Sequence, residues 1–499
     1  MAVAERQTAE APPTPRIEPR SVQRWIDEKP TWKDGTELYN APMTPMQIRI
    51  WALAAAGKFF EGMVVFMTGV ALPLIAFEFG LGAFEHGLVT AASLAGILVG
   101  ASLLGGLSDA VGRRTMFIVE MVIFVAFLIG ACFAPSFWFL LVCLFGLGVA
   151  LGCDYPVAHV MISETISTRA RGRLVLSAFA FQAVGALFGT AVGYLILANV
   201  QEVEAWRWMY AAGVVPAIVV IVLRFTVVES PHWLHNRGRT AEASHSVVRL
   251  LRREPPYPSV VQLTEPEPDA QTHAAHKRGG WALLFSKRHR RATILASVPW
   301  FIQDLGTYGI GIFTPVILAA TVGHQKEHAT SISDIIQNDM LAAKGAAVID
   351  VLLIVGILFA IFLADRVGRI PLQVLGFVGC AAGLAIAALS GQFDGTTQTL
   401  MIFAGFMLFN FMTNLGPNAQ TYLIAGEVFP ITIRATGAGF AASIAKVGAV
   451  LTAFLFPILL VDIGVDALLW GLVATSILGA LVTWWVRIET AGRSLEEFF

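Results

Sequence analysis

Charged residues are scarce in this sequence. Of its 499 residues, 14% are Asp, Glu, Lys or Arg and 56% are hydrophobic, and the mean hydropathy is +0.69. Ordinary soluble domains carry about a quarter charged residues, so the composition indicates a membrane protein. The formal net charge of -1 also excludes the basic surface that nucleic-acid binding requires. We therefore expect contact with the lipid bilayer and no nucleic-acid partner.

Cysteine is also rare. The four cysteines, Cys132, Cys143, Cys153 and Cys380, all lie in apolar runs and form no C-x-x-C pair. This spacing supports neither a disulfide framework nor a metal site. We expect no metal, no cofactor and no enzyme activity.

The N-terminal segment lacks an apolar core of the kind found in secretory signals. Residues 1–45 mix proline with both charge signs, as in "MAVAERQTAEAPPTPRIEPR". A cleaved signal needs a run of about 7–15 apolar residues after a basic start. We predict a solvated cytoplasmic tail.

Long apolar runs, in contrast, are abundant. About twelve windows of roughly 20 residues are long enough to cross some 30 Å of hydrocarbon as helices. The predicted spans are 49–77, 86–107, 115–133, 136–160, 173–198, 207–228, 292–320, 346–364, 369–390, 398–424, 435–461 and 467–487. The hydrophilic stretch 229–290 separates six spans from six and is predicted to be a cytoplasmic linker.

Basic residues near the span ends predict the orientation. They cluster on one side of the predicted topology, for example at Arg113, Arg171, Arg366 and Arg434 and in the central linker. Lys and Arg are enriched in cytoplasmic loops. We expect a multi-pass protein of the plasma (inner) membrane, with both termini, including the tail 488–499, in the cytoplasm.

The two groups of spans share an internal repeat. "GGLSDAVGRR" and "FLADRVGRI" place Asp, Gly and Arg at positions that differ by 256, and two Glu/Arg pairs seven residues apart differ by 263. The matched residues are Asp109, Gly112 and Arg113 with Asp365, Gly368 and Arg369, and Glu164 and Arg171 with Glu427 and Arg434. Repeated halves are typical of transporters. We predict an all-α membrane protein of twelve transmembrane helices in two pseudo-symmetric six-helix bundles, 46–228 and 291–487.

The first loop of this repeat resembles the loop between the second and third helices of the major facilitator superfamily. "VVESPHWL" and "IETAGRSLEEFF" look like signatures of its sugar-porter branch and neighbouring branches. The resemblance implies the two-bundle fold and a gating loop formed by Asp109, Gly112, Arg113, Asp365 and Arg369. The simpler interpretation of the loop is a structural latch that does not touch substrate.

Few ionisable residues appear deep within the predicted spans. We identify Lys58, Glu61, Asp154, Asp304, Asp350 and Lys446. A charge at bilayer depth costs at least roughly 2.5 kcal/mol, so each one should face a cavity or a partner. Lys58 and Asp350 lie close enough to predicted span ends to snorkel or cap. The other four are candidate functional residues.

One helix face combines an acid with two aromatic side chains. Trp300, Asp304 and Tyr308 are four residues apart and therefore lie on one face of a helix. In a later span, Asn414 and Asn418 flank a Gly-Pro break, which frees backbone carbonyls that only a cavity or the protein interior can tolerate.

At this point the chain resembles the proton-coupled phosphate symporters of the superfamily. The resemblance extends over nearly the whole membrane portion and implies substrate binding by Tyr155, Gln182, Trp300, Asp304, Tyr308, Asn418 and Lys446. It also implies proton coupling by Glu61, Asp154 and Asp304. The residue chemistry agrees, because a desolvated anion needs neutral donors and one cation. A nearby acid would repel the anion unless that acid carried a proton.

The sequence thus predicts a monomeric, alternating-access symporter that couples protons to a small solute, most simply inorganic phosphate. An organic acid such as an aromatic acid or nicotinate, or a sugar or polyol, is the alternative. A membrane sensor that does not transport is a more distant one.

Overall fold

The computed structural model describes residues 19–28, 43–104, 107–252, 261–264, 280–322, 332–429 and 433–490. Within these ranges the secondary structure is helical apart from one isolated bridge between Arg20 and Leu263.

The first half of the chain contributes one set of long helices. They are α2 (Pro45–Phe79), α3 (Ala83–Val99) with the π-helical turn η1 (Gly100–Leu104), α4 (Leu107–Val111), α5 (Arg113–Cys132), α6 (Phe137–Thr165), α7 (Thr168–Phe179), α8 (Phe181–Asn199) and α9 (Ala205–Arg224). Thr44 begins α2 with a capping box to Gln47, and Gly80 ends it in the left-handed region at φ 63°. The local sequence therefore fixes both ends of the longest helix in this half.

The second half contributes the matching set. It comprises α13 (Gly280–Leu284), α14 (Arg290–Val322), α15 (Ile332–Val367), α16 (Arg369–Leu389), η2 (Ser390–Gln392), α17 (Gly395–Leu415), α18 (Pro417–Glu427) and α19 (Arg434–Trp485). The predicted Gly-Pro break is present, because α17 ends before Gly416 and α18 begins at Pro417. Helix α19 is 52 residues long and is interrupted at Gly464, whose φ of 79° lies outside helical geometry.

Ten helical segments of the described residues are long and apolar enough to cross a membrane. Helix α14 is not among them, and its central turns carry Gln303, Asp304, Thr307 and Tyr308. With α14 included and α19 divided at Gly464, the described residues hold the twelve predicted spans. The predicted fold class is confirmed.

The largest discrepancy in a predicted span boundary is at the eighth span. The eighth span was expected to begin at residue 346, but α15 begins at Ile332. The polar residues of "ISDIIQNDM" lower the hydropathy without ending the helix, and Asp339 is only 3% exposed. A polar side chain that packs inside the protein therefore does not mark a helix end. Because α15 begins at Ile332, Asp350 lies well inside this helix.

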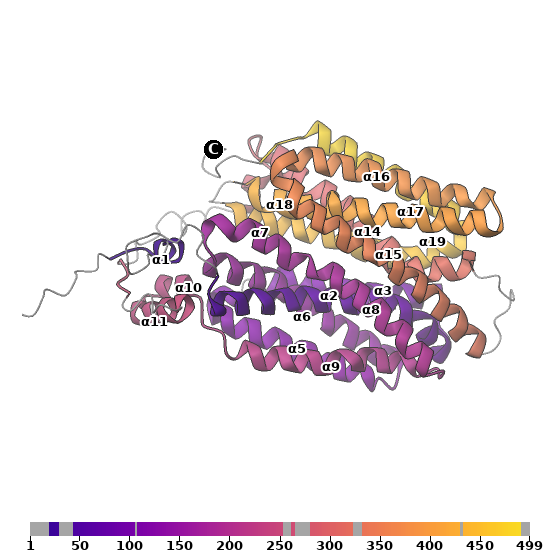
Figure 1. The fold of residues 1–499 in the computed structure, drawn as a ribbon, viewed down its shortest axis with the longest axis horizontal. Helices are drawn as coiled ribbons and strands as arrows, with labels where there is room; N and C mark the ends of the chain where they lie inside the picture. The colour runs from indigo at the N-terminus through magenta and orange to yellow at the C-terminus, as the bar shows by residue number, and fades with distance from the viewer. Residues whose placement is uncertain are drawn as a thin grey trace, which may run out of the picture.

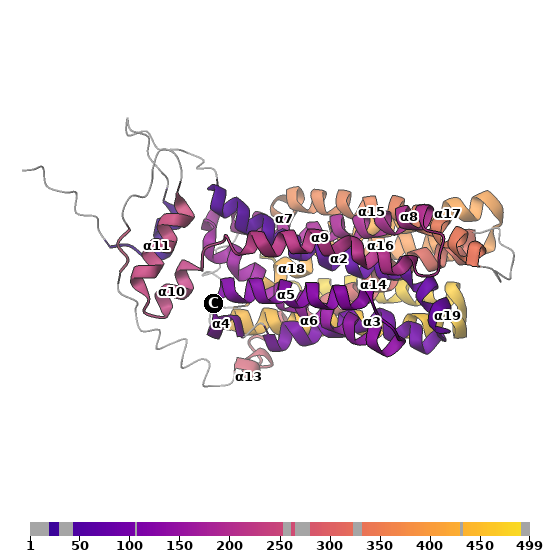
Figure 2. The same ribbon diagram turned by 90° about the horizontal axis from the view of Figure 1, so that it is seen from below.

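The halves form two layers (Figure 1). Helices α2 to α9 make up one layer and α14 to α19 the other, and the layers touch through the pairs α2 with α14, α3 with α19 and α8 with α15. The short helices α10 (Pro231–Asn236) and α11 (Thr240–Leu251) lie at one end of the bundle (Figure 2). We call this the linker end and the opposite end the far end.

Part of the predicted N-terminal tail is packed at the linker end. Helix α1 (Val22–Asp27) buries Val22, Trp25 and Ile26, and the Trp25 indole N–H donates to the Gln262 carbonyl at 3.1 Å. The expectation of a solvated tail is wrong for this segment. These three apolar side chains lie on one short helix, and α10 and α11 pack against that helix.

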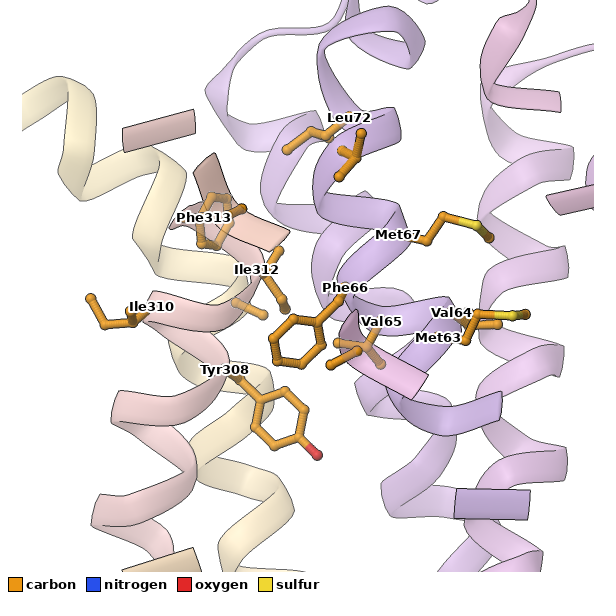
Figure 3. Packing of buried hydrophobic residues seen from close by; sticks show 14 of the residues in the cluster. Met63, Val64, Val65, Phe66, Met67, Leu72, Tyr308, Ile310, Ile312 and Phe313 are labelled. Atoms are coloured by element: carbon orange, nitrogen blue, oxygen red, sulfur yellow. The ribbon is translucent and has the colours of Figure 1, made fainter. Parts of the chain in front are cut away.

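The two layers make backbone-level contact near the far end. A Cβ added to Gly69 of α2 would lie 2.2 Å from the carbonyl oxygen of Ile312 in α14. Figure 3 shows Phe66 of α2 facing Ile312 and Tyr308 of α14 between the two helices. The Thr90 hydroxyl of α3 donates to the Ala453 carbonyl of α19 at 2.7 Å. The far end of the bundle is therefore closed.

The sequence repeat has a structural counterpart at the linker end. Gly112 and Gly368 have φ of 116° and 102° and precede α5 and α16. Glu229 accepts from the backbone N–H of Arg114 at 2.9 Å, and Glu489 accepts from the backbone N–H of Arg369 at 2.9 Å. Each glutamate thus caps the equivalent helix N-terminus with negative charge. The signatures "VES" and "IET" supply these two caps.

Candidate substrate and proton site

Lys446 of α19 lies at the centre of a buried cluster between the two layers. Its Nζ donates to Asp304 Oδ2 at 3.1 Å and to the Tyr308 hydroxyl at 2.8 Å, and it lies 4.0 Å from Glu61 Oε1. The lysine is only 4% exposed, and both carboxylates are equally inaccessible. Its nitrogen also lies 4.5 Å from the centroid of the Tyr308 ring. The predicted helix face of Asp304 and Tyr308 is therefore organised around one cation.

Close helix packing positions this lysine. A Cβ added to Gly448 would lie 2.6 Å from the Phe301 carbonyl, so α14 and α19 approach closely only because that residue is glycine. Gly448 follows Lys446 by two residues, and Phe301 lies one turn before Asp304. The glycine thus sets the separation that the ion pair needs.

Glu61 of α2 accepts hydrogen bonds from three side chains. Lys58 Nζ donates at 3.1 Å, and both Gln182 Nε2 and the Tyr308 hydroxyl donate at 3.2 Å. Gly62 and Gly185 allow α2 and α8 to touch at backbone distance, which brings Gln182 to this position. Gln182 and Tyr308, which are predicted to bind substrate, therefore donate to Glu61, which is predicted to carry protons. Members of the two predicted sets, Gln182, Tyr308 and Glu61, thus lie in one cluster.

The remaining predicted substrate residues lie differently. Trp300 is buried one turn before Asp304 and makes an edge contact with Tyr422 at 6.1 Å between ring centroids. Asn418 donates to Asn414 at 2.6 Å and does not contact the lysine cluster. The side chain of Tyr155 lies outside the described part of the structure, although its backbone is in α6.

A second buried charge cluster lies in the first half, where the sequence had indicated only Asp154. Arg224 of α9 donates to Asp154 Oδ1 at 2.9 Å and to Glu120 of α5 at 2.5 Å. Arg224 is fully buried, and it also donates to the carbonyls of Leu53 and Phe117.

Sequence reasoning missed both Arg224 and Glu120. They lie inside the predicted spans 207–228 and 115–133, so two opposite charges within apolar runs were the available signal. In the described structure, one oxygen of each carboxylate, Asp154 Oδ2 and Glu120 Oε2, has no hydrogen-bond donor. One guanidinium facing two acids can accommodate one additional proton.

Asp154 adjoins the helix that carries Glu61. A Cβ added to Gly57 of α2 would lie 2.1 Å from Asp154 Oδ2. Gly57 is one turn from Glu61 and adjacent to Lys58, which bonds Glu61. The two charge clusters are thus neighbours along α2.

An aromatic group that the sequence did not indicate joins the halves near Trp300. Tyr422 of α18 stacks on Phe179 of α7 with 4.8 Å between centroids and 16° between planes. His159 of α6 makes an edge contact with the same tyrosine at 6.2 Å. The four rings belong to four different helices, so no spacing along the chain reveals the group.

The residues of the predicted gating loop are partly described. Arg113 donates to Ser108 at 3.1 Å and lies 3.7 Å from Glu164, while Arg369 donates to Glu427 at 3.1 and 3.2 Å. These contacts stay within each half of the chain. The side chains of Asp109 and Asp365 lie outside the described residues, as does that of Arg434.

The expectation that Lys58 and Asp350 serve only as snorkelling or capping residues is wrong. Lys58 is 5% exposed and bonds Glu61. Asp350 lies well inside α15 and accepts from Thr190 and Asn410. Lys58 was misplaced because α2 begins at Pro45, several residues before the predicted span.

Comparison with known proteins places this arrangement in a family. The sequence pattern of the family described as "Sugar (and other) transporter" matches residues 51–498. The chain belongs to this family of major facilitator transporters. It is therefore a membrane-spanning transporter and not an enzyme.

The names of similar proteins state different substrates. The inner membrane metabolite transport protein YgcS of Escherichia coli (strain K12) is 29% identical over 456 residues, covering 90% of this chain and 93% of that protein. The probable inorganic phosphate transporter 1-12 of Oryza sativa subsp. japonica is 28% identical over 451 residues, covering 82% and 81%. A solved structure of the Escherichia coli xylose transporter XylE superposes with a TM-score of 0.71 at 19% identity, covering 90% of this chain and 100% of that chain. The last comparison supports the fold.

Proposed function

We propose that this transporter is a proton-coupled symporter of a small anion and that the anion is inorganic phosphate. The observation that carries the proposal is the contact of Lys446 with Asp304 at 3.1 Å, in a buried position between the two halves. A transporter that alternates access has its substrate at such a position. The phosphate transporter among the relatives supports the choice of anion.

The ion pair supplies the coupling. With Asp304 ionised, its charge neutralises Lys446 and repels an incoming anion. Protonation of Asp304 removes that repulsion and releases the ammonium group to pair with the anion. Proton and anion therefore bind together more favourably than either does alone, which is a coupling free energy between two ligands.

Neutral donors complete the anion site. Gln182 and Tyr308 donate to Glu61 in the unliganded protein, so protonation of Glu61 would make both available to an anion. Trp300, Tyr155 and Asn418 are the further proposed substrate residues. Because Asn418 and Lys446 both belong to the second half, α18 would have to move relative to α19 to bring Asn418 closer to the lysine.

Protons can move between the site and the linker end by steps along the first half. By helix rise, Glu120, Asp154 and Glu61 lie roughly 10, 16 and 24 Å from the linker ends of α5, α6 and α2. These depths increase towards Lys446. We propose that Asp154 and Glu61 pass protons between Asp304 and the linker end.

The repeated loops are proposed to keep each half rigid while the halves rock. Arg113 and Arg369 are bonded within their own halves, and Gly112 provides the turn that brings Glu229 to α5. Asp109 and Asp365 are proposed to join these contacts, so that the loops bias gating. We further propose a monomer in the plasma (inner) membrane, with both termini and the linker end in the cytoplasm, as the basic span ends indicate.

A second candidate substrate is an aromatic organic acid. The specific observation is the aromatic group of Trp300, Tyr422, Phe179 and His159 next to the charged cluster. A planar ring could stack there while its carboxylate pairs with Lys446. Phosphate has no apolar surface to use such a group. A sugar or polyol would use the same donors without the cation.

Transport assays in vesicles decide between these substrates. The full chain is reconstituted into proteoliposomes with an imposed proton gradient and offered labelled phosphate, nicotinate or D-xylose in separate reactions. Accumulation of phosphate that collapses with a protonophore supports the proposal. Accumulation of nicotinate but not phosphate would replace phosphate with the aromatic acid, and accumulation without a proton gradient would refute the coupling.

A further inference from the structure

Asp350 of α15 is a buried carboxylate on the boundary between the two halves, apart from the lysine cluster. It is 2% exposed and accepts from the Thr190 hydroxyl of α8 at 2.9 Å and from Asn410 of α17 at 3.4 Å. Thr190 belongs to the first half, whereas Asp350 and Asn410 belong to the second. This acid therefore bridges the two halves.

No cation contacts Asp350 among the described residues. Helix α17 carries no ionisable side chain, and the titratable group of α8 is Tyr194, one turn beyond Thr190. On α15 itself, Lys344 is exposed and Asp339 lies about 16 Å away along the helix axis. The charged or titratable groups of the other helices packed on α15 are Arg49, Lys58, Glu61 and Glu78 on α2, Asp304, Tyr308, Arg290 and Arg291 on α14, Arg369 and Cys380 on α16, Tyr422 and Glu427 on α18, and Arg169, Arg171 and Arg173 on α7. Of those whose side chains are described, none forms a bond with Asp350.

An ionised carboxylate in this position would be costly. Removing a charge from water without a counter-ion costs several kcal/mol, and groups in such sites bind a proton instead. Two neutral hydrogen bonds, one of them 3.4 Å long, offset part of that cost.

The hydrogen bonds are all satisfied when Asp350 is neutral. The Thr190 oxygen lies 2.9 Å from Asp350 Oδ2 and 3.0 Å from the Ala186 carbonyl, but a hydroxyl has only one hydrogen to donate. If Oδ2 carries a proton, it donates to the threonine oxygen, and the threonine donates to Ala186. Asn410 then donates to the unprotonated Oδ1.

We infer that Asp350 is a separate proton-binding site, which holds a proton while α8 and α15 are packed together and releases it when the far end opens. Opening would admit water to the carboxyl and remove the Thr190 contact. The ionised form would then be stabilised by hydration. Proton binding at this position therefore favours closure of the far end, whatever the substrate is.

The experiment measures far-end opening directly and needs no substrate. Leu195 of α8 and Leu341 of α15 are lipid-facing positions near the far end, and each is replaced by cysteine and spin-labelled in a Cys132→Ser background. Pulsed electron resonance then gives the fractions of packed and separated halves from about pH 6 to about pH 9. We expect the ratio of separated to packed molecules to rise by up to about tenfold for each pH unit over which the carboxyl titrates.

Four variants make the test specific. Asp350→Asn reproduces the donor of the neutral acid and should keep the halves packed with less than about a twofold change over the same range. Thr190→Val removes the bridge and should weaken the pH response, whereas Thr190→Ser should keep it. Asp462→Asn should keep it too, because that carboxylate is exposed on α19.

Several results would overturn the inference. They are an unchanged pH response in Asp350→Asn, an unchanged response in Thr190→Val, or opening driven by sodium in place of potassium at constant pH. The last result would assign the site to a metal cation. None of these outcomes depends on phosphate transport, so the proposed function can fail while this inference stands.

Discussion

Replacing Gly69 by alanine should open the far end of the transporter. The added Cβ would lie 2.2 Å from the Ile312 carbonyl oxygen, whereas ordinary contacts begin at 3.4 Å. The difference between these distances is 1.2 Å, which α2 and α14 can gain only by moving apart. The clash exists only while the halves are packed at the far end.

The size of the effect follows from the cost of overpacking. Extra methyl groups in tightly packed sites cost typically about 1–3 kcal/mol. Here that cost applies to the closed state alone, so it shifts the equilibrium towards the open state by about 5- to 150-fold. The gain in helix propensity from glycine to alanine is equal in both states and cancels.

The spin labels at Leu195 and Leu341 measure this shift as an increased fraction of long distances. Gly471→Ala is the matched control, because Gly471 is exposed on α19 and an added Cβ there meets no atom within 4 Å. An unchanged distance distribution in Gly69→Ala, in protein that remains folded, would refute the claim that this contact holds the far end closed.

Three further predictions concern buried charge and pH. Lys446→Ala leaves Asp304 buried without a cation and should lower stability by about 3–5 kcal/mol, with phosphate binding in titration calorimetry weakened at least tenfold; unchanged phosphate affinity would point to a neutral substrate. Arg224→Met leaves Asp154 and Glu120 buried without a cation and should therefore lower the thermal midpoint of unfolding. Adding Glu120→Gln removes one of these two charges and should restore part of the midpoint; no recovery in the double variant would contradict the proposed pairing. The pKa of His232, outside the spans, is lowered to about 4, first by burial and then by nearby positive charge. The unfolded state binds the proton of His232 more tightly than the folded state does. The contribution of the neutral histidine to the free energy of unfolding is therefore complete above about pH 6.5 and is lost as the pH falls towards 4. Hydrogen exchange in α1 should accelerate over that pH range, and His232→Asn should abolish the change.

Hydropathy and repetition in the sequence were sufficient to predict the architecture. Each predicted span has a helical counterpart, and the matched turns at Gly112 and Gly368 share a positive φ. Hydropathy predicts the spans well because a segment that crosses lipid must be a long apolar helix, whichever helices surround it. The exceptions arose where polar residues lie inside a helix, as in α15, or where a short apolar face packs outside the membrane, as in α1.

The site was predictable only along single helices. The spacing of Asp304 and Tyr308 placed both on one face, and Lys446 contacts both. The bonds of Glu61 to Gln182 and of Arg224 to Asp154 join separate helices, so no local pattern encodes them. The bridge from Thr190 to Asp350 likewise depends on how the two halves pack.

Asp304→Asn in proteoliposomes tests the central claim most directly. The variant removes the proton-binding group but keeps a neutral side chain of the same size, so phosphate exchange should continue while accumulation driven by a proton gradient is lost. Asp462→Asn, an exposed acid to amide change in α19, is the control and should accumulate phosphate normally. Undiminished gradient-driven accumulation in Asp304→Asn would contradict the assignment of the coupling proton to Asp304.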